Sequence, residues 1–147
     1  TVVDSQLVAS MLASLSTRTA GSVSAVCLGT PHFSVAEFGE LVGTLGEAHT
    51  HPSVTVIVTT SRSVWAEVQL RGWDMLLGAA GIEVVLDTCT YYLPRSTGVT
   101  GTVMTNSAKW AYYAPGMLDV EVVFASLADC VASAIAAEVR LSDEVSA

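Results

Sequence analysis

The fold is decided by residues 23–37, which read VSAVCLGTPHFSVAE. Residues 23–29 are a β-branched, apolar run that ends in glycine, which is typical of a strand buried in a parallel sheet. Ser34 and Glu37 then form the S-x-x-E pattern of a capping box, so we expect a helix that begins there and continues to about Gly46. A strand that is followed at once by a helix indicates a parallel sheet if the pattern repeats along the chain.

The alternation of strands and helices does repeat. Periodicity predicts a helix at 5–16, strands at 54–59, 82–86, 102–105 and 120–124, helices at 63–80, 107–113 and 127–139, and a turn-rich segment at 91–101. The helix at 63–80 is expected to be interrupted near Arg71 and Gly72 and closed by Gly81. Pro115 is expected to stop the helix at 107–113. We therefore predict one α/β domain over residues 1–147, with three α/β/α layers and a mainly parallel sheet of about five strands.

Composition and charge exclude several classes of protein. The 147 residues are 51% hydrophobic and 14% charged, and six Lys+Arg against fourteen Asp+Glu give a net charge of −8. So acidic a chain lacks the basic face that nucleic acids or an anionic membrane surface require. Its apolar runs are much shorter than the ~20 residues of a membrane helix. Three widely spaced cysteines do not form a secreted disulfide framework, which favours the cytoplasm.

Polar and reactive side chains follow the predicted strands, at the sheet edge where ligands bind in open parallel sheets. They are His32, Arg62, Cys89, Ser107 and Lys109. Lys109 is the chain's only lysine, and a scarce positive charge at this edge suits an anionic ligand. The competing interpretation is that these residues are ordinary loop residues and helix caps.

The cysteines differ in the roles that their positions predict. Cys27 lies inside an apolar strand and Cys130 near the start of a helix, so both are expected to be structural. Cys89 directly follows a strand, where a thiolate can reach a ligand. One cysteine cannot hold a metal alone, and no CxxC motif is present. The segment after the first strand also lacks the spacing of a phosphate-binding loop, which disfavours a nucleotide-binding fold.

Five motifs together resemble the C-terminal part of the catalytic region of aconitase X, over about residues 23–137. They are GTPHFS at 29–34, TSR at 60–62, DTC at 87–89, TNSAK at 105–109 and SLADC at 126–130. The resemblance implies an aconitase-like domain and a hydro-lyase that uses an iron–sulfur cluster. Thr30, where the archaeal type tends to have cysteine, favours the bacterial type, which dehydrates cis-3-hydroxy-L-proline to Δ1-pyrroline-2-carboxylate with a [2Fe-2S] cluster. Ala108 departs from the glycine expected there, which questions the local backbone geometry.

The resemblance also implies roles for individual residues. Cys89 is the expected cluster ligand, with Cys130 and then Cys27 as the alternatives. The dehydration chemistry and the i, i+2 spacing of Ser107 and Lys109 in one loop make these two the expected catalytic residues. The residues expected to bind the substrate are His32, Ser61, Arg62 and Asn106. Removing a proton beside a carboxylate leaves negative charge that either Arg62 or Lys109 could stabilise, and an iron centre assists the departure of hydroxide. Ser107 would bind substrate or carry a proton, with Lys109 lowering its effective pKa.

Two other functions stay open beside this one. The first is a related lyase that acts on mevalonate 5-phosphate, although six basic residues make a phosphorylated substrate less attractive. The second is a non-catalytic α/β subunit of a larger assembly, which the low surface charge would suit. We expect the chain to be a fragment or one part of a longer catalytic chain, and to be inactive without the remaining domains of that enzyme.

Overall fold

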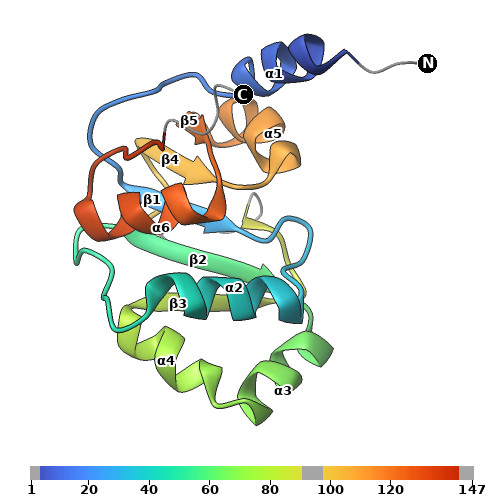
Figure 1. Ribbon diagram of the computed structural model, residues 1–147, viewed down its shortest axis with the longest axis vertical. Helices are drawn as coiled ribbons and strands as arrows, with labels where there is room; N and C mark the ends of the chain where they lie inside the picture. Colours follow the sequence, from blue (N-terminus) through green and yellow to red (C-terminus); the bar gives the residue numbers. More distant parts are fainter. Residues whose placement is uncertain (1–3, 91–97, 143–147) are drawn as a thin grey trace.

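A five-stranded, fully parallel sheet forms the centre of the computed structural model, which describes residues 4–90 and 98–142 (Figure 1). The strands are β1 (Ala25–Leu28), β2 (Thr55–Thr60), β3 (Ile82–Leu86), β4 (Thr102–Thr105) and β5 (Glu121–Phe124). Four of them closely match the predicted ranges, and β1 is shorter than its predicted range. Most of the turn-rich segment predicted at 91–101 lies outside the described residues.

The strand order is β3-β2-β1-β4-β5, so the first strand in sequence is central in space. The chain adds β2 and β3 on one side of β1 and then returns to the other side for β4 and β5. Ala25 of β1 accordingly pairs with Thr55 of β2 on one side and with Val103 of β4 on the other. The direction of winding therefore reverses between β1 and β4, and ligands bind at such a switch point in open α/β sheets.

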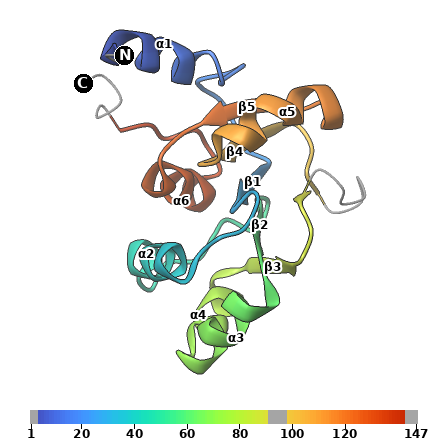
Figure 2. The same ribbon diagram turned by 90° about the vertical axis from the view of Figure 1, so that its right-hand side faces the viewer.

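Helices cover both faces of this sheet, which confirms the three-layer α/β/α prediction (Figures 1 and 2). The helices are α1 (Ser5–Ala13), α2 (Val35–Leu45), α3 (Arg62–Leu70), α4 (Trp73–Ala80), α5 (Ala108–Leu118) and α6 (Leu127–Ala136). One core joins α2, α3, α4 and α6 to strand side chains such as Val58 and Met104. The other core packs Trp110 of α5 against Cys27 and Val103 on the opposite face. Alternate strand residues thus face different cores, as the pleat requires.

Three predicted helix ends are wrong. Helix α1 ends at Ala13 rather than 16, and the other two ends differ for identifiable physical reasons. Helix α5 continues through Pro115 to Leu118, because Trp110 and Ala114 are fully buried and their packing outweighs the local cost of proline. Helix α6 ends at Ala136 rather than 139. Beyond it the chain pairs with an N-terminal segment instead, through hydrogen bonds such as Val139 N–H to the Gly21 carbonyl at 2.8 Å.

The apolar face predicted for the first helix is present, but none of its residues is buried. Leu7 and Met11 are 57% and 62% exposed, although Leu15, just beyond the helix, packs partly against the second core. Among the described residues, no helix is long and apolar enough to cross a membrane.

The chain can leave β1 in the observed direction only because residue 29 is glycine. Gly29 has a φ of +86°, and a Cβ added there would lie 2.4 Å from the Thr59 carbonyl oxygen and 2.9 Å from the Phe33 Cβ. The first of these neighbours is backbone and cannot rotate away. Residues 29–34, which connect β1 to α2 and are called the β1 loop below, consequently cross directly over the end of β2.

Gly29→Ala is expected to lower the free energy of unfolding by about 2–4 kcal/mol, since it combines a left-handed backbone with steric overlap. The matched control is Gly43→Ala in α2, where an added Cβ meets nothing within 4 Å. That change should stabilise the protein by up to about 1 kcal/mol, because alanine has the higher helix propensity. Urea denaturation of both variants measures the difference, and equal stabilities would contradict the proposed crowding at Gly29.

Candidate active site

Three hydrogen bonds hold the β1 loop on the end of β2. The Phe33 N–H donates to the Thr59 carbonyl at 2.8 Å, and the Thr59 hydroxyl donates to the Gly29 carbonyl at 3.0 Å. The Thr60 hydroxyl, also fully buried, donates to the Phe33 carbonyl at 2.6 Å. Because both threonines belong to a central strand, the loop has a fixed position relative to the sheet.

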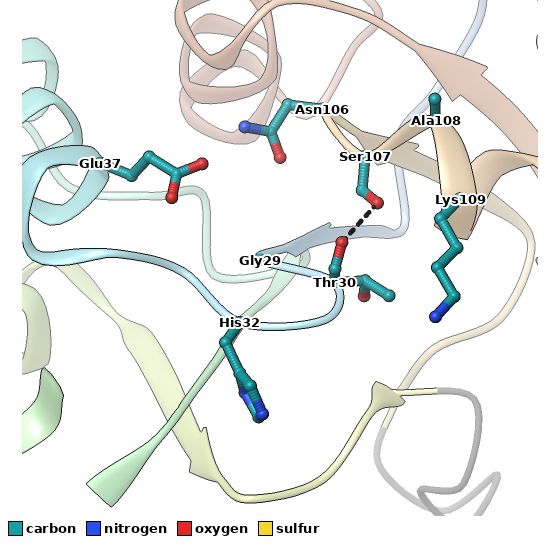
Figure 3. Close-up of a pocket in the computed structure, with 8 residues that line it drawn as sticks. All are labelled: Gly29, Thr30, His32, Glu37, Asn106, Ser107, Ala108 and Lys109. Carbon is teal, nitrogen blue, oxygen red and sulfur yellow. Dashed lines mark hydrogen bonds between the residues drawn. The ribbon is translucent and has the colours of Figure 1, made fainter. Parts of the chain in front are cut away.

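A cavity of about 300 Å³ opens at the switch point of the sheet, between the β1 loop and the β4 loop, which is formed by residues 106 and 107 between β4 and α5 (Figure 3). It is lined by Gly29, Thr30, His32, Glu37, Asn106, Ser107, Ala108 and Lys109. These residues come from the β1 loop, the first turn of α2 and the start of α5. The volume is at the lower end of the range of small-molecule sites.

Ser107 connects the two loops that form this cavity. Its hydroxyl donates a hydrogen bond to the Thr30 carbonyl at 2.9 Å, which Figure 3 shows as a dashed line. The same oxygen accepts a hydrogen bond from the Trp110 N–H at 3.2 Å and so caps α5. Ser107 therefore places the N-terminus of α5, with its partial positive charge, against the cavity.

The cavity carries opposite charges on its two sides. Lys109 extends along one side from the first turn of α5, and the carboxylate of Glu37 lies across from it on α2 (Figure 3). The cation and the helix N-terminus are on the same side. This arrangement suits a carboxylate ligand at α5 and leaves a hydrogen-bond acceptor opposite.

Four of the seven predicted site residues line the cavity: His32, Asn106, Ser107 and Lys109. The imidazole of His32 is the exception in orientation, since it points away from Ser107 and Lys109 (Figure 3). His32 is also exposed, so its ring is open to solvent.

Ser61 and Arg62 do not line the cavity. Ser61 is the N-cap of α3 and accepts a hydrogen bond from the Val64 N–H at 3.3 Å. The Arg62 Nε lies 2.6 Å from Asp87 Oδ2, and the Arg62 side chain is 82% exposed. Asp87 also accepts a hydrogen bond from the Arg62 backbone N–H at 3.2 Å. The first residue of α3 thus pairs with the residue that follows β3, and neither lines the cavity.

Cys89 does not line the cavity, but it contacts a residue that does. Its half-buried thiol is 3.7 Å from the Thr30 hydroxyl, and Thr30 does line the cavity. Within residues 4–90 and 98–142, no three His, Cys, Asp or Glu side chains come together as a metal site. Cys89 is therefore placed where it could serve as one ligand of a cluster, and the described residues do not supply the other ligands beside it.

The other two cysteines are buried in the two cores, as their positions in the sequence predict. Burial raises the pKa of the Cys27 thiol to about 12, although a hydrogen bond with Thr90 acts in the opposite direction. Burial also raises the pKa of Cys130, with a smaller contribution from the neighbouring Asp129. Both thiols therefore stay protonated near neutral pH in the metal-free chain.

The model of the aconitase X third domain matches residues 23–136 of this chain. The chain belongs to the aconitase X family. Its relatives include the cis-3-hydroxy-L-proline dehydratase of Pseudomonas aeruginosa, which is 43% identical over 112 residues, or 75% of this chain. The cis-3-hydroxy-L-proline dehydratase of Hypocrea jecorina is 38% identical over 114 residues, or 76% of this chain. A phosphomevalonate dehydratase large subunit from Methanothermobacter thermautotrophicus is 31% identical over 99 residues, which is 67% of this chain and 24% of that protein.

The solved aconitase X of Thermococcus kodakaraensis in its holo-form shares this fold, with a TM-score of 0.76 at 20% identity over 90% of this chain and 33% of that one. The chain spans only 19% of the length of the two hydroxyproline dehydratases. As a third domain of aconitase X, it thus corresponds to one part of those larger proteins.

Sequence reasoning did not place Glu37 or Thr30 at the site. The S-x-x-E pattern predicts only a capping role for Glu37, yet the same pattern locates Glu37 in the first turn of the helix after β1, which is next to the carboxyl edge of the sheet. The capping box is therefore a signal from which its position at the site can be predicted. Thr30 contributes through its backbone carbonyl, a group that every residue has and that no sequence pattern identifies.

Iodoacetamide at pH 8 should label Cys89 in the native, metal-free chain and leave Cys27 and Cys130 unlabelled until urea unfolds the protein. A thiol of pKa about 12 is ionised to only about one part in ten thousand at this pH, and burial also blocks access. Mass spectrometry of the labelled peptides measures the three rates. Cys89→Ser, the matched control, should remove the native-state label, and labelling of Cys130 at the rate of Cys89 would contradict its burial.

Proposed function

We propose that this domain forms part of the active site of a hydro-lyase that converts cis-3-hydroxy-L-proline to Δ1-pyrroline-2-carboxylate. The observation that carries the proposal is the cavity at the switch point, where Ser107 and the only lysine of the chain meet at a helix N-terminus. Identities of 43% and 38% to two cis-3-hydroxy-L-proline dehydratases support this substrate.

Lys109 and the first turn of α5 are proposed to bind the carboxylate of the substrate. The reaction removes the proton on the carbon that bears this carboxylate, and negative charge then spreads onto the carboxylate oxygens. A cation and a helix N-terminus close to those oxygens would stabilise the transition state more than the ground state. Asn106 lines the same side of the cavity and can orient the substrate through its amide.

Ser107 is proposed to bind the substrate or to carry the proton. In the resting structure its hydroxyl hydrogen is donated to the Thr30 carbonyl, so Ser107 must exchange this hydrogen bond when substrate enters. The Lys109 ammonium and the α5 N-terminus would both stabilise the negative charge on a deprotonated Ser107. The proton transfer thus uses the same positive potential that binds the carboxylate.

An iron–sulfur cluster, which we propose to be of the [2Fe-2S] type, would supply a Lewis acid for the departing hydroxide. Cys89 is the residue of this chain proposed to hold it, with the other ligands in the remaining domains of the enzyme. The three free cysteines support a reducing, cytoplasmic location. The partners proposed for this domain are the small imino acid and those remaining domains.

A phosphomevalonate dehydratase activity is the second candidate, supported by the 31% identity to the archaeal large subunit. The charge of the cavity disfavours it. Among the described residues that line it, Lys109 is the only lysine or arginine, and Glu37 adds a carboxylate, whereas a phosphorylated acid brings two anionic groups.

The substrate assignment is tested with an enzyme that contains this domain together with the remaining aconitase X domains. We expect dehydration of cis-3-hydroxy-L-proline, measured as formation of the cyclic imine, at a kcat/KM at least about 100-fold above that for mevalonate 5-phosphate. The reverse preference would establish the second candidate. Absence of both activities in an iron-loaded enzyme would instead favour a non-catalytic subunit.

Ser107→Ala should reduce kcat by about 100-fold or more, the usual contribution of a group that transfers a proton. The matched control is Ser126→Ala, because Ser126 caps α6 in the same way but does not line the cavity. Each variant loses one N-cap and about 1 kcal/mol of stability, and Ser107→Ala also loses the hydrogen bond to the Thr30 carbonyl. Only Ser107→Ala should lose turnover, and similar kcat values in the two variants would leave Ser107 with its capping role alone.

A further inference from the structure

Glu37 has one carboxylate oxygen that the fold does not use. Its Oε2 accepts hydrogen bonds from the Ser34 backbone N–H at 2.8 Å and from the Ser34 hydroxyl at 2.7 Å, which completes the capping box. Its Oε1 accepts no hydrogen bond from any residue in the described ranges 4–90 and 98–142. The cap therefore holds the carboxylate in place and leaves one oxygen free.

This free acceptor belongs to the candidate active site. Glu37 is half-buried and lines the cavity, and its carboxylate is directed from α2 into the space that Ser107 and Asn106 border on the other side (Figure 3). Lys109 supplies the opposite charge from α5. A ligand that has a carboxylate at one end and a positively charged nitrogen at the other matches this distribution, whereas a ligand with two anionic groups places one of them near Glu37.

We propose that Glu37 is a specificity-determining residue, which accepts a hydrogen bond from the ring ammonium of a cyclic imino acid and disfavours phosphorylated hydroxy acids. The inference rests on the proposed function and deepens it. The capping box gives it a mechanism, because Ser34 fixes the side chain before substrate arrives and little conformational entropy is lost on binding. The selectivity thus comes from a residue that also has a structural role.

Glu37→Gln separates these two roles. Glutamine also completes a capping box, so the helix start is retained while the negative charge is removed. The matched control is Glu40→Gln, which makes the same change of charge three residues later in α2, at an exposed position that does not line the cavity. Melting temperatures of the two variants should stay close to that of the unchanged protein.

The test measures dissociation constants by calorimetry for two unreactive ligands, in the enzyme assembled with the remaining aconitase X domains. L-proline has the ring, the carboxylate and the ammonium, and cyclopentanecarboxylate lacks only the nitrogen. Glu37→Gln should weaken L-proline binding by about ten-fold or more, the effect of losing a hydrogen bond between charged groups, and leave cyclopentanecarboxylate within about two-fold. Glu40→Gln should change neither constant. Inorganic phosphate, used as a competitive inhibitor, should bind more tightly to Glu37→Gln.

The outcomes separate this inference from the proposed function. If the unchanged enzyme dehydrates cis-3-hydroxy-L-proline and Glu37→Gln keeps its preference for L-proline over cyclopentanecarboxylate, Glu37 does not recognise the nitrogen and the inference is wrong, while the proposed function stands. If Glu37→Gln weakens both ligands equally, its role is structural and the inference is also wrong. If the unchanged enzyme acts on mevalonate 5-phosphate alone and shows no preference for L-proline, both proposals are overturned.

Discussion

The close approach of Gly29 to the backbone of β2 is the constraint on which the site depends. A side chain at residue 29 would occupy the space of the Thr59 carbonyl oxygen, 2.4 Å away, so only glycine lets the β1 loop cross at this point. Thr59 and Thr60 then hold the loop with buried hydroxyl groups. Because the loop is fixed in this way, the Thr30 carbonyl accepts a hydrogen bond from Ser107, and the segments after β1 and β4 border one cavity.

The strand order explains why this crossing lies beside the candidate active site. Strands β2 and β3 lie on one side of β1 and strands β4 and β5 on the other, so the loops after β1 and β4 lead away from each other and leave a space between them. Ser107 spans that space with a hydrogen bond instead of filling it with an apolar side chain. The same atom caps α5, which makes the position of the helix N-terminus and the width of the cavity dependent on one hydroxyl group.

The features that sequence patterns predicted well are those that neighbouring residues determine. Local residue preferences and short apolar runs bounded by turns are sufficient to predict three features. They are the capping box of Ser34 and Glu37, the interruption at Gly72 and the strand at 82–86. Strand order is not local, because a helical crossover can lead to either side of a strand. The same limit applies to Arg62, whose partner Asp87 lies 25 residues further along the chain and holds it away from the cavity.

Charge is the remaining consideration for the choice of substrate. A net charge of −8 on the chain opposes the approach of anions, and its effect is screened only beyond about 8 Å at physiological ionic strength. A cyclic imino acid is a zwitterion with no net charge, so this potential costs it little, and the opposite charges of Lys109 and Glu37 would orient it as proposed. A phosphorylated hydroxy acid carries between about two and three negative charges and meets both the general potential and the Glu37 carboxylate. The overall composition and the arrangement of the cavity therefore favour the same class of ligand, although one acts over the whole surface and the other over a few ångströms.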